Sequence, residues 1–206
     1  MTERKNNIFI ISAPSGSGKS TLIQLLVTHI PRLFFSISHT TRPPRAGEQE
    51  GVEYFFVSDE RFQEMIQKEM FLEWAMVHGY HYGTSRHMIE LAQKEDKDVV
   101  LDVDIQGAAG LRRMIPDATS IFIMPPSYEI LKERLVRRQK DTTEQIEHRL
   151  ENARREIQSY ASYEYVVVNE DLGSALENLA SIVRSRRCTR EALTQRIAAI
   201  LKSFGN

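Results

Sequence analysis

The sequence has a single cysteine and no long apolar run. Cys188 alone, among 206 residues, excludes an intrachain disulfide and a multi-cysteine metal site. The N-terminal residues lead into only a short apolar stretch, whereas a bilayer span needs roughly 18 to 20 apolar residues. We therefore expect a soluble protein of a reducing compartment, the cytoplasm.

The chain also lacks an excess of charge of either sign. Lys and Arg number 27 and Asp and Glu 28, so the net charge is −1. This balance gives no bulk attraction to nucleic acid or to a membrane surface, and any anion site must come from a local cluster. We expect neither as a partner. The length is sufficient for one sizeable core, with or without small inserted lobes.

Short apolar runs alternate with helical patterns along most of the chain. The runs predict strands at Ile8–Ser12, Asp98–Val103, Thr119–Met124 and Tyr165–Val168. Helical patterns are present at Lys19–His29, Ser85–Glu95, Ser127–Arg138, Thr143–Ser159, Ser174–Arg186 and Thr189–Ser203. Thr142 and Gln145 form a capping box before one of these helices. The alternation predicts an α/β three-layer sandwich with a parallel central sheet.

Two segments depart from this alternation. Residues 34–57 carry prolines and glycines between strand-like pieces, which is typical of an inserted, partly antiparallel lobe. Residues 127–159 are densely charged, which is typical of a helical hairpin held in water. We predict a core of residues 1–37, 85–126 and 160–206, a lobe of residues 38–84 and a lid of residues 127–159.

The stretch IISAPSGSGKSTL, Ile10 to Leu22, lies between a predicted strand and a predicted helix. It ends as the pattern G-x-x-x-x-G-K-[ST] requires, but Ala13 replaces the first glycine, which is acceptable where φ is negative. Backbone N–H groups of such a loop converge on an anion at a helix N-terminus, and Gly16 and Gly18 allow a close approach. The alternative is a Gly/Ser-rich turn that only caps the helix.

In a phosphate loop the lysine reaches the β- and γ-phosphates and the following hydroxyl coordinates Mg²⁺. Lys19 and Ser20 hold these positions. The pattern predicts a site for ATP and Mg²⁺ formed by Ala13, Pro14, Ser15, Gly16, Ser17, Gly18, Lys19, Ser20 and Thr21.

Charged residues mark two further candidate positions. Asp102 and Asp104 follow a predicted strand at the edge where α/β sheets bind ligands, so that Asp102 is placed to hold Mg²⁺ through water. Strand-end acids also cap helices, which is the alternative.

Arg42 and Arg45 offer guanidinium forks for a phosphate monoester, and Tyr54 offers a hydroxyl donor. A solvated basic turn is the alternative for the arginines.

Longer stretches carry a resemblance to a known family. SHTTRPPRAGEQEGVEYFF (Ser38–Phe56), with APSGSGKST before it, FLEWAMVHGYHYGTS (Phe71–Ser85) after it and then LDVDIQG (Leu101–Gly107), resembles guanylate kinase. The resemblance extends from Ile8 to Arg186. It implies a P-loop NTPase fold and transfer of the γ-phosphoryl group of ATP to GMP, with dGMP as a further acceptor.

The resemblance also implies roles for individual residues. Glu73 would accept hydrogen bonds from guanine N1–H and the 2-amino group, neither of which adenine has, and Thr84 would bond guanine O6. In the lobe, the GMP site would comprise Ser38, Arg42, Arg45, Glu48, Tyr54, Glu73, Tyr82 and Thr84, together with Asp102 and Asp104 at the sheet edge. Glu48 would steady the arginines.

The same resemblance places further residues on the ATP side. Arg134, Arg138 and Arg149 would form a mobile lid over ATP and, with Lys19 and Arg42, stabilise the transferring charge. Asn169 would lie near the adenine. Gln139 and Lys140 stand where many members of the family have a glycine after the second lid arginine, which predicts altered lid kinetics.

Several interpretations stay open. The last helical pattern has Leu193, Ile197, Ile200 and Leu201 on one face, which favours packing on the core or on a second subunit over membrane or RNA contact. The oligomeric state is not predicted. His78, His81 and His87 lack a metal-binding set and are interpreted as loop or surface residues. A phosphate-loop kinase for another acceptor and a noncatalytic binding module are the alternative functions.

Overall fold

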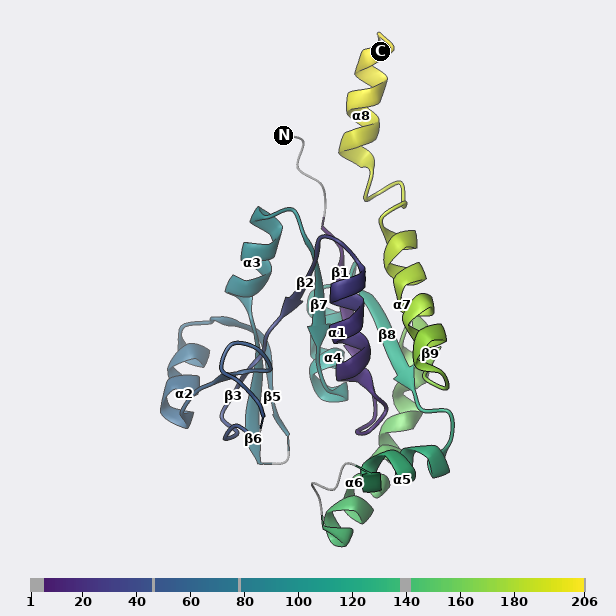
Figure 1. Ribbon diagram of the computed structural model, residues 1–206. Coiled ribbons are helices and arrows are strands. Elements are labelled where there is room, and N and C mark those ends of the chain that lie inside the picture. Colours follow the sequence, from purple (N-terminus) through teal and green to yellow (C-terminus); the bar gives the residue numbers. More distant parts are fainter. Residues whose placement is uncertain (1–5, 46, 78, 138–141, 206) are drawn as a thin grey trace.

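The computed structural model describes residues 6–45, 47–77, 79–137 and 142–205. Five parallel strands form a central sheet in the order β2-β7-β1-β8-β9 (Figure 1). They are β1 (Ile8–Ser12), β2 (Leu33–Ser36), β7 (Asp98–Asp102), β8 (Thr119–Met124) and β9 (Tyr165–Val168). The predicted α/β fold with a parallel central sheet is confirmed.

Helices cover both faces of this sheet, which gives three layers. On one face lie α1 (Lys19–His29) and α7 (Leu172–Arg186), whose apolar side chains pack with Phe9 and Ile11. On the other lie α3 (Arg86–Lys94) and α4 (Ile105–Met114), which pack with Ile10 and Leu101. Because the central strands are buried on both faces, they appear in the sequence as nearly continuous apolar runs.

A second sheet has four short strands in the order β4-β3-β6-β5. They are β3 (His39–Thr40), β4 (Phe55–Phe56), β5 (Phe71–Val77) and β6 (Tyr80–Ser85), and α2 (Asp59–Gln67) packs beside them. β3 pairs parallel with β4, whereas β6 pairs antiparallel with both β3 and β5. The partly antiparallel arrangement expected in this part of the chain is therefore present.

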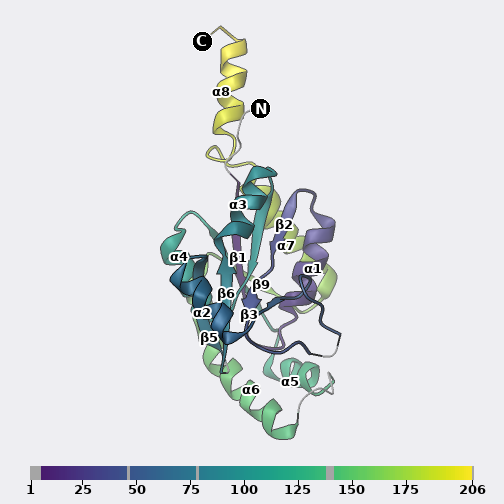
Figure 2. The ribbon, with the colours of Figure 1, turned by 90° about the vertical axis from the view of Figure 1, so that its left-hand side faces the viewer.

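The charged segment after β8 forms a helical hairpin of α5 (Tyr128–Arg137) and α6 (Thr143–Glu156), followed by the 3-10 turn η1 (Ile157–Ser162). A small apolar cluster around Leu135 and Leu150 joins the two helices. The predicted capping box of Thr142 and Gln145 is present at the start of α6. In Figures 1 and 2 this hairpin lies at the opposite end of the molecule from the last helix.

That last helix, α8 (Thr194–Ser203), begins five residues later than predicted and has no buried residue. Ile200 and Leu201 are exposed, and both views show α8 extending away from the body of the molecule (Figures 1 and 2). Of the two packings favoured above, packing on the core is absent for this helix, and packing on a second subunit stays a prediction. Only the turn before it is anchored, through the buried Ala192.

Other differences from the sequence prediction have local causes. α7 begins at Leu172 rather than at Ser174, because the side chain of Asp171 accepts a hydrogen bond from the Ser174 N–H and caps the helix. Residues 34–36 open the segment 34–57 that departs from the alternation, but they belong to β2 and pair with β7, which agrees with their place in the predicted core of residues 1–37. α2 and α4 are not predicted at all, and α4 contains two glycines that weaken its helical pattern.

Candidate active site

The carboxyl ends of the central strands gather the candidate residues at one edge of the sheet. The phosphate loop follows β1, Asp102 ends β7, α5 follows β8 and Asn169 follows β9. Open α/β sheets bind ligands at this edge. The order of the strands thus brings together segments that are far apart in the sequence.

The phosphate loop adopts a backbone conformation with positive φ that its glycines permit. Gly16 and Gly18 have φ of 91° and 86°, and Gly18 is the N-cap of α1. Ala13 is not among the described residues with positive φ, so the condition for an alanine at that position is met. Asn169 stabilises the loop, because its Nδ2 donates a hydrogen bond to the Ser17 carbonyl oxygen at 2.7 Å.

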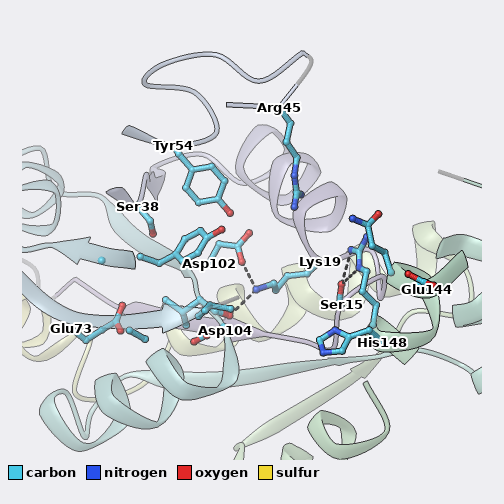
Figure 3. Close-up of a pocket in the computed structure, with 17 residues that line it drawn as sticks. Ser15, Lys19, Ser38, Arg45, Tyr54, Glu73, Asp102, Asp104, Glu144 and His148 are labelled. Carbon is cyan, nitrogen blue, oxygen red and sulfur yellow. Dashed lines mark hydrogen bonds and ion pairs between the residues drawn. The ribbon is translucent and has the colours of Figure 1, made fainter. Parts of the chain in front are cut away.

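Lys19 points from the first turn of α1 to the end of β7. Its Nζ lies 2.5 Å from Asp102 Oδ1 and donates to the Val103 carbonyl at 2.7 Å (Figure 3). Both side chains are about four-fifths buried, at 17% and 18% exposure. The pair places a cation and a carboxylate, of the types that bind phosphate and metal ions, beside each other in the cavity.

The helical hairpin touches the phosphate loop directly. Arg149 donates from Nε and Nη2 to the Ser15 hydroxyl at 3.1 and 2.7 Å. Arg134 donates to the Asn169 carbonyl at 2.9 Å. A Cβ atom built on Gly16 would lie 2.9 Å from the Leu135 side chain, so α5 closes on the loop. Arg138 and the Gln139–Lys140 pair lie outside the described residues.

Arg42 is the centre of a polar cluster beside the second sheet. Its Nη2 lies 2.9 Å from both carboxylate oxygens of Glu48, and its Nε donates to Tyr82 Oη at 3.2 Å. The guanidinium also lies 5.4 Å from the centre of the Tyr54 ring. Glu48 further accepts from the Arg45 backbone N–H at 2.7 Å.

The hydrogen bonds within this cluster favour the charged forms of Arg42 and Glu48. Burial alone would lower the pKa of Arg42, but the hydrogen bonds from its guanidinium to Glu48 and Tyr82 outweigh burial and raise it. Burial would raise the pKa of Glu48, and its bonds from Arg45 and Arg42 outweigh that effect and lower it. Burial, reinforced by the Asp102 charge, raises the pKa of Tyr54, so its hydroxyl stays protonated.

Glu73 lies on β5, and Figure 3 shows its side chain at one side of the pocket. Its Oε1 accepts a hydrogen bond from the Thr84 hydroxyl at 2.7 Å across the β5–β6 pair. Burial raises the pKa of Glu73 to about 7, and the Asp104 charge adds to the shift while the Thr84 bond opposes it. Asp104 also caps α4, because its Oδ1 accepts from the Gly107 N–H at 2.7 Å. The capping alternative therefore holds for Asp104.

One cavity of about 570 Å³ joins these parts. Figure 3 shows it with Glu73 on one side, Ser15, Glu144 and His148 on the other, and Lys19 between them. Of the predicted site residues, the lining contains Ser15, Lys19, Ser38, Arg45, Tyr54, Glu73, Tyr82, Asp102, Asp104 and Arg149.

Other predicted residues lie behind the lining or beside it. Arg42, Glu48 and Thr84 contact lining residues from behind. Arg134 and Asn169 contact the phosphate loop or each other. Ser20 and Thr21 are exposed on the first turn of α1, outside the lining.

Sequence reasoning missed several lining residues, namely Ala75, Val77, Gly83, Val103, Glu144, Gln145 and His148. Strand periodicity places Ala75 and Val77 on the face of Glu73. Helical spacing places Gln145 on the face of Arg149. Because Glu73 and Arg149 are predicted site residues, these two periodicities could have identified Ala75, Val77 and Gln145 from the sequence.

Of the three histidines interpreted as loop or surface residues, His87 agrees with that interpretation and His81 does not. His81 lies within β6, its side chain is 13% exposed, and it contacts Asp59 at 3.3 Å and the Phe62 ring. His87 is exposed on α3, and His78 lies outside the described residues. Within the described ranges no group of three or more His, Cys, Asp or Glu side chains forms a metal site. In the same ranges no helix has the length and apolarity of a membrane span.

Comparison with known proteins identifies the family. The guanylate kinase profile matches residues 5–186. The chain belongs to the guanylate kinase family. A guanylate kinase of Coxiella burnetii is 45% identical over 197 residues, which cover 96% of each chain. One of Helicobacter pylori is 49% identical over 179 residues, or 87% of each chain.

A solved structure gives the same result for the fold. The crystal structure of guanylate kinase from Anaplasma phagocytophilum superimposes with a TM-score of 0.78 at 32% identity. The match covers 93% of this chain and 92% of that one. The predicted resemblance is therefore confirmed over nearly the whole chain, including the segments that form the second sheet and the helical hairpin.

Proposed function

We propose that this protein transfers the γ-phosphoryl group of ATP to GMP and releases ADP and GDP. Membership of the guanylate kinase family supports this activity, and the curated relatives carry that name. The observation that carries it in this chain is the single cavity that joins Lys19 of the phosphate loop to Glu73 of the second sheet. A phosphoryl donor and a guanine nucleotide would meet there.

On the donor side, the loop from Ala13 to Ser20 would hold the ATP phosphates through backbone N–H groups, and Lys19 would bind the β- and γ-phosphates. Asp102 and Ser20 offer oxygen ligands of the type that Mg²⁺ takes, and Mg²⁺ is commonly bound by one or two protein groups together with phosphates. These residues fit the ion. When bound, Mg²⁺ would neutralise charge on the phosphates.

On the acceptor side, Arg42, Arg45, Tyr54 and Tyr82 would hold the GMP phosphate. The contact of Arg42 Nη2 with both carboxylate oxygens of Glu48 supports this role, because it fixes the guanidinium before the acceptor arrives. Ser38, Thr84, Asp104 and Glu73 would surround the base. A buried carboxylate rejects adenine, because adenine lacks the two donors that would satisfy it.

The reaction needs alignment and charge neutralisation rather than a covalent intermediate. A GMP phosphate oxygen would attack the γ-phosphorus while the bond to the β-phosphate oxygen breaks, and ADP would leave with that oxygen. Arg134 and Arg149, with Arg138 beyond the described residues, would stabilise the transferring charge. The contact of Arg149 with Ser15 supports the role, because it places the guanidinium at the loop.

The remaining expectations belong to the same proposal. The division into a core of residues 1–37, 85–126 and 160–206, an acceptor lobe of residues 38–84 and a lid of residues 127–159 is supported by the two sheets and the helical hairpin. A cytoplasmic location is supported by the single exposed thiol of Cys188. Use of dGMP rests on the resemblance alone.

The test is ADP release from ATP and Mg²⁺ with GMP, dGMP, AMP, CMP or UMP as acceptor, measured for the wild type and for Glu73→Gln. We expect turnover with GMP, little with AMP, and a GMP-over-AMP preference that falls by at least about 10²-fold in the variant. An unchanged preference would show that the base is recognised elsewhere. If the protein bound ATP but phosphorylated none of these nucleotides, the alternative of a kinase for another acceptor would be favoured. If it did not bind ATP, the noncatalytic module would be favoured.

A further inference from the structure

Two glycines of α4 face the strand that carries Glu73. α4 packs against β5. A Cβ atom built on Gly107 would lie 2.8 Å from Glu73 Oε2 and 3.2 Å from its Cδ, whereas one built on Gly110 would lie 3.8 Å from Glu73 Cβ. The first contact is too short for real atoms, and the second is ordinary. The Glu73 carboxylate thus occupies the space that a side chain at position 107 would need.

Local backbone geometry does not account for Gly107. The residue lies in the first turn of α4 and is not among those with positive φ, so an L-residue is sterically allowed there. Glycine within a helix is less favourable than alanine, because it loses more conformational freedom on folding. A tertiary contact is therefore the physical reason for a glycine at this position.

We propose that Gly107 is a specificity-determining positioning residue, whose missing side chain lets the Glu73 carboxylate lie against the first turn of α4. Gly107 also donates its N–H to Asp104 Oδ1, and a Cβ at this position would lie 3.1 Å from that oxygen. One backbone position thus locates both acidic residues on the acceptor side of the cavity. Figure 3 shows these two carboxylates near each other.

The atom in conflict is the end of a flexible side chain, so Gly107→Ala should move Glu73 and leave the fold intact. Glu73 then leaves the position from which it accepts from Thr84. Guanine would lose well-aligned hydrogen bonds, whereas ATP, held at the opposite side of the cavity, would not be affected. The inference rests on the proposed function, since it assigns to Gly107 an effect on recognition of the guanine base of GMP.

The experiment compares Gly107→Ala with Gly110→Ala in full-length protein. Both changes add one methyl group to the same helix and raise its helix propensity equally. We expect kcat/KM for GMP to fall about tenfold in Gly107→Ala, with kcat/KM for AMP and KM for ATP unchanged. Gly110→Ala should stay within about twofold of wild type. Melting temperatures of both variants should equal or exceed that of the wild type.

Each contrary result overturns the proposal. Equal GMP kinetics in the two variants would show that Gly107 does not position Glu73. A Gly107→Ala protein that fails to fold would show that the carboxylate does not yield to the methyl group. Equal losses for GMP and AMP would indicate general damage. A wild-type protein that does not phosphorylate GMP is a separate result, because it refutes the proposed function itself.

Glu73→Asp gives an independent readout. Aspartate is one methylene shorter, so its carboxylate is withdrawn from position 107. We expect Glu73→Asp to lower kcat/KM for GMP less in the Gly107→Ala background than in the wild type, because the two residues act through one contact. Strictly additive losses in this double-mutant cycle would contradict the coupling.

Discussion

The donor and acceptor sides of the cavity are built by different means. The phosphate loop is one continuous stretch that we propose binds through backbone N–H groups, and Asp102, the ion-pair partner of Lys19, lies in the neighbouring strand. The acceptor side uses side chains from β5, β6, the loop between β3 and β4, and Ser38 just before β3. A backbone site of this kind recognises the phosphate group common to all nucleotides, whereas the side-chain site is able to distinguish one base from another.

The two sides also differ in how their charges are compensated. Lys19 and Asp102 compensate each other across the sheet edge, and Arg42 is compensated by Glu48. Glu73 has a hydroxyl partner and an acidic neighbour, and its pKa is raised to about 7. The charge of Glu73, on the acceptor side, therefore changes near neutral pH.

The largest expected effect comes from removing the donor-side cation. Lys19→Ala should lower kcat by at least about 10² to 10³-fold, because preorganised charge at a transferring phosphoryl group is lost. The measurement is steady-state ADP release with GMP, together with a thermal melt.

Lys97→Ala is the matched control, since Lys97 forms an ion pair with Glu95 on the surface. That variant should retain wild-type rates. A Lys19→Ala protein that turned over near the wild-type rate would remove the phosphate loop from the mechanism and leave the acceptor side to explain activity alone.

A smaller effect is expected from the arginine cluster. Glu48→Gln should raise KM for GMP about tenfold with little change in KM for ATP, because Arg42 loses one charged partner and its orientation. Initial rates at varied GMP and varied ATP measure the difference.

Glu64→Gln is the control, because Glu64 pairs with Arg61 at an exposed position of α2. Exposed pairs of this kind contribute little. If both variants raised KM for GMP equally, the pairing of Arg42 with Glu48 would have no specific role on the acceptor side.

The smallest expected effect is on the pH dependence. As pH rises through about 7, Glu73 becomes ionised and able to accept from both guanine donors, so kcat/KM for GMP should rise several-fold between pH 6 and pH 8. Glu73→Gln should lack this part of the rise. The GMP phosphate titrates near pH 6 in both proteins, so the difference between the two profiles isolates the carboxyl group.

Stability provides the second measurement of the same group. Its native pKa of about 7 lies above the ordinary value of 4.5. The unfolded chain therefore releases the proton first, and stability falls as pH rises between these two values. Glu73→Gln should melt above the wild type at pH 8, with the difference shrinking toward pH 5. A constant difference would contradict the raised pKa.

The sequence predicted the parts that depend on local pattern. The capping box at Thr142, the strand–loop–helix around Lys19 and the four apolar strands are read directly from residue spacing. The edge strand β2 and helix α4 were missed, because each is stabilised by neighbours distant in sequence. Within the site, the pairing of Thr84 with Glu73 and of Lys19 with Asp102 depends on strand register, which spacing alone does not determine.

The resemblance supplied candidates that physical reasoning alone would have left open. Glu73 beside Trp74 has no distinguishing local pattern, and its raised pKa follows from burial. The sequence gives Gly107 no role beyond the end of the motif LDVDIQG, because its contact with Glu73 depends on the packing of α4 against β5.

Asp104 both caps α4 and lines the cavity, so a substitution at this position has two separate effects. Serine or asparagine at position 104 would still cap α4 but would remove a negative charge from the cavity. Glutamate would retain the charge but is not a preferred capping residue. Aspartate meets both requirements, so a substitution at this position loses either the cap of α4 or the negative charge at the cavity.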